Sequence, residues 1–417
     1  MSQGDEVLTG QTVDTNAAWL AARLTELGVR VVRHVTVGDE VEAIRGALAA
    51  AAAEASLVIC TGGLGPTADD LTAEAVALAF AAPLALDEVA LAHVEGLYRA
   101  FGRAMPPSNR KQALLPARSL RLDNPHGTAC GFALEHGGAW VACLPGVPRE
   151  MKPMFETQVL PRVVARLQLA PGRLVTLRTT GVGESTLQDR IGAFAHPAAV
   201  LGYRTSLGEN QIKLRFTAGT PDDEVRALVA DVAARIGSPV FAVDGLDGLG
   251  GGLAATVGAA LVAQGHTLAV AESCTGGQLS ALCTAEPGAS AWFLEGAVVY
   301  DNAAKVARAG VPAALLEAHG AVSEPVARAL AEGIRTALGA THGLATTGIA
   351  GPSGGSEAKP VGTVHLAHAS PHGTTHRLVR LAGDRERIQG LAAHAVLDLL
   401  RRHLQGLHPA DAAPPPR

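Results

Sequence analysis

Apolar and polar positions follow a helix–strand rhythm over the first sixty residues. A helically spaced segment, TNAAWLAARLTELG, is followed by a β-branched run, VRVVRHVTV, by an alanine-rich helical segment, DEVEAIRGALAAAAAEA, and by the apolar run LVIC. This order is typical of a parallel α/β sheet. Because LVIC leads directly into TGGLGPTADD, we expect a glycine turn and then a helix with Thr67 as its N-cap. A further α/β stretch through GFALEH and AWVACLPGVP extends this first domain over residues 1–170.

Two more patterned regions follow. Residues 173–243 contain the strand-like runs RLVTLRTT and QIKLRFTAG, each joined to a helical segment, which predicts a small α+β domain of the size of a KH module. It contains no G-x-x-G loop, so the sequence does not support RNA clamping. The glycine-rich residues 244–252 predict a flexible linker, residues 253–405 a C-terminal α/β domain, and residues 406–417 a disordered tail.

Composition narrows the class of protein. The 417 residues are too many for one core, and the net charge of −5 argues against the basic footprint that nucleic-acid binding needs. The five cysteines form no C-x-x-C pair, so we expect neither a zinc knuckle nor a disulfide framework. No apolar run approaches the roughly 20 residues of a membrane helix, and MSQGDEV does not resemble a signal peptide. These features predict a cytoplasmic protein without membrane or direct nucleic-acid partners.

The loop TGGLGPTADD is the first candidate site. It follows a strand, where helix N-termini and free N–H groups attract anions in α/β sheets. Gly62, Gly63 and Gly65 would let the backbone approach a phosphate, and Asp70 could hold a divalent metal that bridges phosphates. The alternative, given equal weight, is a plain glycine turn in which Asp69 and Asp70 favour the helix dipole.

The segment AESCTGG places two potential nucleophiles, Ser273 and Cys274, at the end of a strand. The amides of Gly276 and Gly277 would stabilise an oxyanion there. We favour Ser273, because cysteine at a strand end is more often a small buried residue.

A serine nucleophile needs a base. The nearest histidines, His266 and His319, have no matching aspartate arrangement. Lys305 in VVYDNAAK follows another strand end, and burial beside the Tyr300 hydroxyl would leave its amine uncharged. A solvated helix lysine is the alternative.

The loop TTGIAGPSGG is the third candidate site. Gly348 and Gly351 would leave backbone N–H groups free to hold a phosphate, and Thr347 would hydrogen-bond at the reacting centre. Arg385 and Arg387 could pair with the phosphate, although surface solvation is their default interpretation. The alternative for the loop is simple flexibility.

Together these motifs resemble the CinA family from about Gly4 to about Leu404. The resemblance rests on the blocks GDEVLTGQTVDTN, TGGLGPTADDLT, PSNRKQALLP, NPHGTACGF, LPGVPREM, TTGVGES, AESCTGG, VVYDNAAK, TTGIAGPSGG, KPVGTV and GDRERI. It implies an N-terminal domain with a molybdopterin-binding-like fold that cleaves ADP-ribose with a divalent metal (Mg, Mn or Co), and a metal-free C-terminal nicotinamide mononucleotide (NMN) amidohydrolase. It also implies a homodimer.

The resemblance also assigns residues. Ser273, Lys305, Tyr300 and Thr347 would be catalytic. It also places Arg387 at the substrate. From the motifs themselves, we expect Gly276, Gly277, Gly348 and Gly351 to bind the substrate as well. We also expect an N-terminal nucleotide site of Gly62, Gly63, Gly65, Thr67, Asp14 and Asn16, with Asp70 on the metal.

Two departures from the family pattern bear on the first domain. Only MSQ precedes GDEV, so either the start codon is misassigned or the first strand is absent. Cys130 stands where the family has proline, a change expected to be mild. Two other functions fit the motifs: a molybdenum-cofactor-type binder or adenylyl-transfer relative, and a competence or recombination accessory protein that acts through protein partners.

Overall fold

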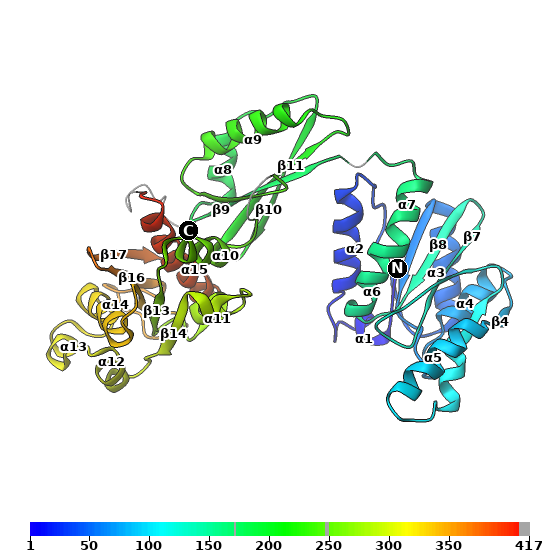
Figure 1. The fold of residues 1–417 in the computed structure, drawn as a ribbon, viewed down its shortest axis with the longest axis horizontal. Helices are drawn as coiled ribbons and strands as arrows, with labels where there is room; N and C mark the ends of the chain where they lie inside the picture. Colours follow the sequence, from blue (N-terminus) through cyan, green and yellow to red (C-terminus); the bar gives the residue numbers. More distant parts are fainter. Residues whose placement is uncertain (171, 247–249, 408–417) are drawn as a thin grey trace. The chain divides into compact units, whose positions relative to one another are not determined.

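The computed structural model describes residues 1–170, 172–246 and 250–407. The chain divides into two compact units, Met1–Pro171 and Gly172–Arg417 (Figure 1). Residues 247–249 of the expected linker and residues 408–417 of the expected tail lie outside the described residues. No helix within the described ranges is long and apolar enough to cross a membrane.

The first unit is built around a six-stranded sheet in the order β2-β1-β3-β8-β7-β6. Its strands are β1 (Ser2–Gln3), β2 (Thr36–Val37), β3 (Leu57–Thr61), β6 (Leu120–Leu122), β7 (Gly131–His136) and β8 (Ala139–Leu144). Its helices are α1 (Asp5–Leu8), α2 (Thr15–Glu26), α3 (Val41–Glu54), α4 (Thr72–Ala79), α5 (Glu88–Ala100), α6 (Pro148–Met154) and α7 (Leu160–Arg166). A 3-10 helix (Pro107–Ala113), a π-helical segment (Phe155–Val159) and a ribbon of β4 (Leu84–Leu86) and β5 (Leu114–Pro116) complete the unit.

Alternation along the buried strands gives this sheet an apolar core on each face. Val58 and Cys60 of β3 pack with α3, α4 and α5, whereas Ile59 packs with α2, α6 and α7. Successive strand residues point to opposite faces, so a continuous apolar run such as LVIC fits a strand covered on both sides. The helices on either side of the sheet are visible in Figure 1.

The first strand is short rather than absent. Ser2 and Gln3 form β1, which pairs in parallel with β2 on one side and β3 on the other. Because β1 offers only two residues, just Thr36 and Val37 of the predicted strand VRVVRHVTV pair with it. The rest of that run borders a cavity of about 290 Å³.

The predicted helix start at Thr67 is wrong. Helix α4 begins at Thr72, and residues 65–70 form a turn closed by the Asp70 carboxylate. That carboxylate accepts hydrogen bonds from the Gly65 amide (2.7 Å) and the Thr67 amide (2.8 Å). Aspartate bonding to nearby backbone amides competes with helix formation, which explains the delay.

The second unit begins with a four-stranded antiparallel sheet in the order β10-β11-β9-β12, covered by two helices. The elements are β9 (Leu174–Thr180), α8 (Glu184–Ile191), β10 (Ala199–Ser206), β11 (Glu209–Phe216), α9 (Asp222–Ile236) and β12 (Val240–Asp244). The sequence predicted only β9 and β11 as strands. In β10 one side chain of eight is buried, so the strand lacks a strong apolar alternation.

A second sheet follows in the order β14-β13-β15-β16-β17. Its strands are β13 (Leu268–Glu272), β14 (Phe293–Val298), β15 (His342–Gly348), β16 (Thr363–Ser370) and β17 (Gly373–Arg380). Helices α10 (Leu253–Gln264), α11 (Gln278–Thr284) and α15 (Arg385–Leu404) cover one face, and α12 (Asn302–Ala309), α13 (Ala313–His319) and α14 (Glu324–Leu338) cover the other. Strands β13, β14 and β15 run parallel, so their carboxyl ends meet at one edge.

Candidate functional site

The carboxyl ends of the three parallel strands bring the predicted C-terminal site together. Glu272, the last residue of β13, stands opposite Val298 of β14 and Thr346 of β15. The Ser273 amide donates to the Thr346 carbonyl oxygen at 3.1 Å. Ser273, Thr347 and the residues that follow β14 therefore share one edge of the sheet, as the sequence predicted.

Glu272 holds the turn that carries Ser273. This side chain is fully buried, and its carboxylate accepts from the Thr275 hydroxyl (2.7 Å) and from the amide and hydroxyl of Ser280. It also accepts from the amides of Gly277 (3.0 Å) and Leu279 (3.1 Å). A carboxylate at the first turn of α11 satisfies donors that a helix start leaves unpaired. The single Glu272 carboxylate thus stabilises the turn that carries Ser273 through these hydrogen bonds.

The two glycines of the turn have different roles. The Gly277 amide is bonded to Glu272, so it is not available to an oxyanion, contrary to the sequence prediction. The Gly276 amide donates to no described residue, and Gly276 is exposed. Both residues have positive φ angles, 61° and 101°, which favour glycine.

The two candidate nucleophiles lie in different surroundings. Cys274 packs into the apolar cluster of α10 and α15, and burial raises the pKa of its thiol to about 12. A thiol in this state is not a nucleophile at neutral pH. The Ser273 side chain makes no hydrogen bond to any described residue. Ala269 and Ala271 of β13 face α12 and α14, and this alternation places Ser273 on the same side as Lys305.

Lys305 is buried, with 1% of its surface exposed. Its ammonium donates to the Tyr300 carbonyl oxygen at 2.6 Å, and no hydrogen bond joins it to Ser273 within the described ranges. Burial lowers the pKa of Lys305 from its ordinary value, while the charge of Asp301 acts in the opposite direction. The solvated lysine of the alternative interpretation is excluded.

Tyr300 contacts Lys305 through its carbonyl and not, as expected, through its hydroxyl. Tyr300 is 62% exposed, and its phenol oxygen accepts a hydrogen bond from Arg385 at 3.4 Å. Arg385 also donates to the Gly351 carbonyl oxygen at 2.8 Å. Arg385 therefore links the Tyr300 segment to the glycine loop.

Arg387 does not lie at this site, which corrects the sequence prediction. Its side chain folds over Gly383 and borders a small hollow shared with β10, β11 and the turn after β9. The Asp384 side chain caps α15 by accepting from the Arg387 amide (2.9 Å), and this cap fixes the rotation of the first helical turn. Arg385 and Arg387 consequently point to different regions.

Thr347 is buried, and its hydroxyl donates to the Ala321 carbonyl oxygen at 2.7 Å. It thus connects β15 to the segment before α14. Close packing explains why residue 348 is glycine, because a Cβ there would lie 2.6 Å from the Thr363 carbonyl oxygen. Gly351 has a positive φ of 82° in the loop that meets Arg385.

The N-terminal candidate residues surround a cavity of about 600 Å³ in the first unit. Among the predicted residues, the cavity is lined by Gly62, Gly63, Gly65, Asp14, Asn16 and Asp70. Thr67 is not in its wall, because its amide and hydroxyl bond to Asp70. Three buried polar atoms of cavity residues have no partner among the described residues: Ser2 Oγ, Gln3 Nε2 and Asn16 Oδ1. Unpaired buried polar atoms are costly, so this cavity suits a polar ligand.

The residues present suit a divalent ion with few protein ligands. Asn16 lines the cavity and its buried Oδ1 has no partner among the described residues, while Asp70 Oδ1 accepts the Gly65 amide. Mg²⁺ commonly takes one or two protein oxygens and completes its shell with water and phosphate. Within the described residues, Asp70 belongs to no group of three close His, Cys, Asp or Glu ligands.

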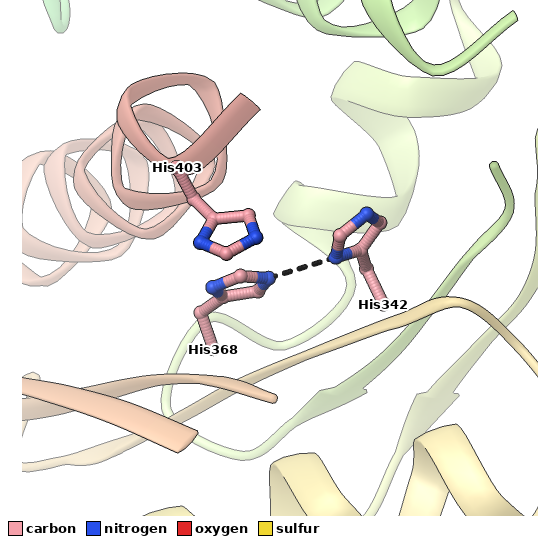
Figure 2. Close-up of side chains that lie close together, drawn as sticks. All are labelled: His342, His368 and His403. Atoms are coloured by element: carbon pink, nitrogen blue, oxygen red, sulfur yellow. Dashed lines mark hydrogen bonds between the residues drawn. The ribbon is translucent and has the colours of Figure 1, made fainter. Parts of the chain in front are cut away.

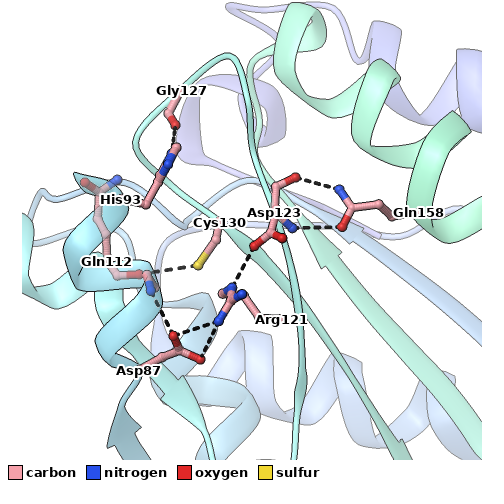
Figure 3. Close-up of polar contacts among 9 residues, drawn as sticks. Asp87, His93, Gln112, Arg121, Asp123, Gly127, Cys130 and Gln158 are labelled. Atoms are coloured by element: carbon pink, nitrogen blue, oxygen red, sulfur yellow. Dashed lines mark hydrogen bonds and ion pairs between the residues drawn. The ribbon is translucent and has the colours of Figure 1, made fainter. Parts of the chain in front are cut away.

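Cys130 is buried, and its side chain lies near Gln112 and Arg121 (Figure 3). Its thiol faces the Gln112 carbonyl oxygen at 3.8 Å, and burial raises its pKa to about 12. Arg121 bridges Asp87 (2.9 Å) and Asp123 (2.7 Å) nearby. The thiol is packed as a small apolar group.

Sequence reasoning missed Glu272 and Gln389, whose side chain donates to the Cys274 carbonyl oxygen at 2.8 Å. It named Arg385 and Arg387 together as phosphate partners and assigned substrate binding to Arg387. A signal for Glu272 was present, because an acid directly before a turn rich in small residues is a cap candidate for the following helix. Gln389 lies 115 residues from Cys274, and no local pattern joins them.

Sequence comparisons agree with this two-part organisation. Residues 251–404 match the CinA C-terminal domain, and residues 1–165 match the probable molybdopterin binding domain. These matches confirm the predicted fold class of both regions.

Relatives resemble the chain along nearly its whole length. A CinA-like protein of Anaeromyxobacter sp. (strain Fw109-5) is 47% identical, covering 97% of this chain and 98% of the relative. A CinA-like protein of Myxococcus xanthus is 43% identical, covering 96% of each. Among solved structures, the protein CinA with unknown function from Thermoplasma acidophilum is 38% identical, covering 38% of this chain and 94% of that one, with a TM-score of 0.36.

Proposed function

Since this chain belongs to the CinA family, we propose that its C-terminal domain hydrolyses the carboxamide of nicotinamide mononucleotide, giving nicotinate mononucleotide and ammonia. The observation that carries the proposal is the buried Lys305, whose pKa burial lowers, on the same side of the sheet edge as the unpaired hydroxyl of Ser273. Activation of a serine requires a base that can accept the proton of its hydroxyl, and a lowered pKa makes an amine a better candidate for this role.

In the proposed reaction, the Ser273 hydroxyl attacks the carboxamide carbon and Lys305 accepts the hydroxyl proton. The exposed Gly276 amide donates to the oxyanion. As the C–N bond breaks, Lys305 returns the proton to the departing nitrogen, and ammonia leaves. Water then attacks the serine ester, with Lys305 accepting its proton, and hydrolysis restores the hydroxyl. This half of the protein needs no metal for these steps.

Binding of the nucleotide part would fall to the glycine loop and to Arg385. The Arg385 guanidinium already contacts the Gly351 carbonyl and the Tyr300 hydroxyl, at the same edge as Ser273. A guanidinium suits the 5′-phosphate because it offers paired donors. Such contacts remote from the amide supply binding energy that orients the reacting carbon.

Ammonia release from nicotinamide mononucleotide by the purified full chain tests the proposal. We expect Ser273→Ala and Lys305→Ala each to abolish release without unfolding the chain, as followed by circular dichroism. Cys274→Ala is the matched control and should stay active, because its thiol is buried and protonated. Full activity of Ser273→Ala, or loss only in Cys274→Ala, would refute the assignment.

For the N-terminal domain we propose metal-dependent hydrolysis of the pyrophosphate of ADP-ribose. Support comes from the cavity of about 600 Å³ that the glycine loop borders and from the unpaired polar atoms of its wall. Asn16 and Asp70 would hold the divalent ion, which would neutralise charge on the pyrophosphate when bound.

The test is AMP formation from ADP-ribose with Mg²⁺, Mn²⁺ or Co²⁺, and its loss in Asn16→Leu. Selective binding of a pterin without turnover would instead favour the molybdenum-cofactor-type function. The homodimer implied by the resemblance is likewise a proposal, which light scattering of the full chain tests.

A further inference from the structure

Four histidines of the second unit form a cluster: His266, His342, His368 and His403. Figure 2 shows three of them, His342, His368 and His403. His342 is the first residue of β15, and His266 stands just before β13, so both mark the amino ends of strands whose carboxyl ends carry the proposed deamidase site. His368 lies on β16 and His403 on the last turn of α15. The proposed deamidase chemistry uses none of them.

Ring nitrogens of three histidines in this cluster point towards one another. One ring nitrogen each from His342, His368 and His403 lies within 4.8 Å of the other two. His342 Nδ1 and His368 Nε2 are 3.0 Å apart, and each of these residues is only 1% exposed. His403 is exposed. Two ligands would thus be fixed by the sheet, and the third would lie at the surface, where an ion can enter.

The surroundings of the rings favour ligation over ion pairing. Within the described ranges, His342 bonds to His368 and His266, and no carboxylate is paired with either buried ring. A neutral imidazole has one nitrogen lone pair that can bind a metal ion. His368 Nδ1 is buried without a partner among the described residues, so hydrogen bonds among the rings do not satisfy the cluster.

We propose that His342, His368 and His403 bind one divalent transition-metal ion, with Zn²⁺ as the reference ion. Imidazole nitrogens suit Zn²⁺, Cu²⁺ or Ni²⁺, whereas Mg²⁺ and Ca²⁺ prefer oxygen. Three protein nitrogens leave the fourth tetrahedral position open on the exposed side of His403.

His266 would support the site through a hydrogen bond to the ligand His342 and would not bind the ion itself. If His342 binds the ion through Nδ1, its Nε2–H can donate to His266 Nδ1, which lies 3.0 Å away. Ligand histidines commonly donate their second ring nitrogen to such an acceptor, which fixes the tautomer. The hydrogen bond is already in place within the described chain.

The ion would tie the end of α15 to the sheet. The same helical segment carries Arg401 and Arg402, which are buried and both bond to Asp398 at 2.7 Å. Arg401 also donates to the Ser238 carbonyl oxygen at 3.0 Å, so this end of α15 joins the two sheets of the second unit. A bound metal would therefore stabilise the unit rather than act on NMN.

The test uses the full chain, stripped with a chelator and then titrated with Zn²⁺ in equilibrium dialysis and thermal unfolding. We expect His403→Ala to bind one equivalent less Zn²⁺ than the wild type and to lose the rise in Tm that Zn²⁺ gives. His319→Ala, which removes an exposed histidine on α13, is the matched control and should behave as the wild type.

Co²⁺ identifies the ligands, because tetrahedral nitrogen coordination gives strong visible absorption that an oxygen site in the first unit does not give. The wild type should show this absorption, and His403→Ala should lose it. Equal Zn²⁺ stoichiometry and Tm response in wild type and His403→Ala, or no Zn²⁺ bound by the wild type, would overturn the proposal. The cluster would then be a stack of hydrogen-bonded neutral rings.

Discussion

The Lys305 ammonium donates to the backbone carbonyl of Tyr300 at 2.6 Å, while the phenol of the same tyrosine accepts from Arg385 at 3.4 Å. One residue thus holds the proposed base through its main chain and an arginine through its side chain. A substitution at Tyr300 changes only its side chain. It therefore removes the contact to Arg385 and keeps the carbonyl contact to Lys305.

Tyr300→Phe should therefore keep kcat for NMN deamidation within a few-fold of the wild type and raise KM modestly, because only the contact to Arg385 is lost. Steady-state ammonia release measures both constants. A fall in kcat of about 100-fold or more, the scale of general acid–base catalysis, would instead place the phenol in the proton path.

The deamidation rate should rise with pH as Lys305 loses its proton, and then level off. Burial lowers the pKa of this lysine below 10.5, so the rise should lie below that pH. In Lys305→Arg the side chain stays protonated, and we expect a loss of roughly 100- to 10,000-fold with no such rise. A pH profile of kcat/KM for both proteins checks this. An unchanged profile in the variant would exclude Lys305 as the base.

The free energy of unfolding should also depend on pH, because Lys305 is buried and its pKa differs between the folded and unfolded states. Below the folded-state pKa both states carry the proton, and the folded protein bears the full cost of a buried charge. As pH rises from that pKa towards 10.5, only the folded state releases the proton, so the free energy of unfolding rises. Lys305→Met has no such titration, so its stability relative to the wild type should fall over this window. Urea unfolding at several pH values measures the difference, and a constant difference would contradict it.

Much of the C-terminal site was predictable because local sequence encodes it. Strand runs that end in AESCTGG, VVYDNAAK and TTGIAGPSGG put Ser273, Lys305 and Thr347 at one sheet edge once the strands are parallel. Side-chain direction was not predictable. Whether Lys305 meets the hydroxyl or the carbonyl of Tyr300 depends on how α12 follows its Asp301 cap.

Other features depend on tertiary contacts. The length of β2 is set by its two-residue partner β1, although VRVVRHVTV alone has strong β-propensity. His266, His342, His368 and His403 come from segments up to 137 residues apart, and each alone resembles an ordinary surface or core residue. Only the assembled sheet and α15 bring them together.

Arg385 and Arg387 provide a matched pair for substrate binding. Arg385→Ala should raise KM for NMN about 10- to 100-fold, because a hydrogen bond to a charged group contributes about 1.5–3 kcal/mol. Arg387→Ala should leave KM unchanged, because its side chain lies over Gly383 and not at the Tyr300 edge. Initial-rate measurements over a range of NMN concentrations separate the two. The reverse result would restore Arg387 as the phosphate ligand.

Glu272→Gln should destabilise the second unit by roughly 2–3 kcal/mol. The carboxylate accepts five hydrogen bonds, from Thr275, Gly277, Leu279 and both donors of Ser280. An amide of the same shape turns its NH₂ towards N–H donors whichever way it is placed, so buried donors lose their acceptor. Because Glu272 adjoins Ser273 and orders its turn, deamidation should also fall. Urea unfolding and ammonia release measure the two effects.

The control for this change is Glu317→Gln on the exposed face of α13, which should alter stability by less than about 0.5 kcal/mol. A further check comes from the position of Gly277, whose amide needs the same carboxylate. If Glu272→Gln keeps wild-type stability and rate, then the Glu272 hydrogen bonds do not set the position of the Ser273 turn, and its geometry must come from the strand pairing with Thr346 alone.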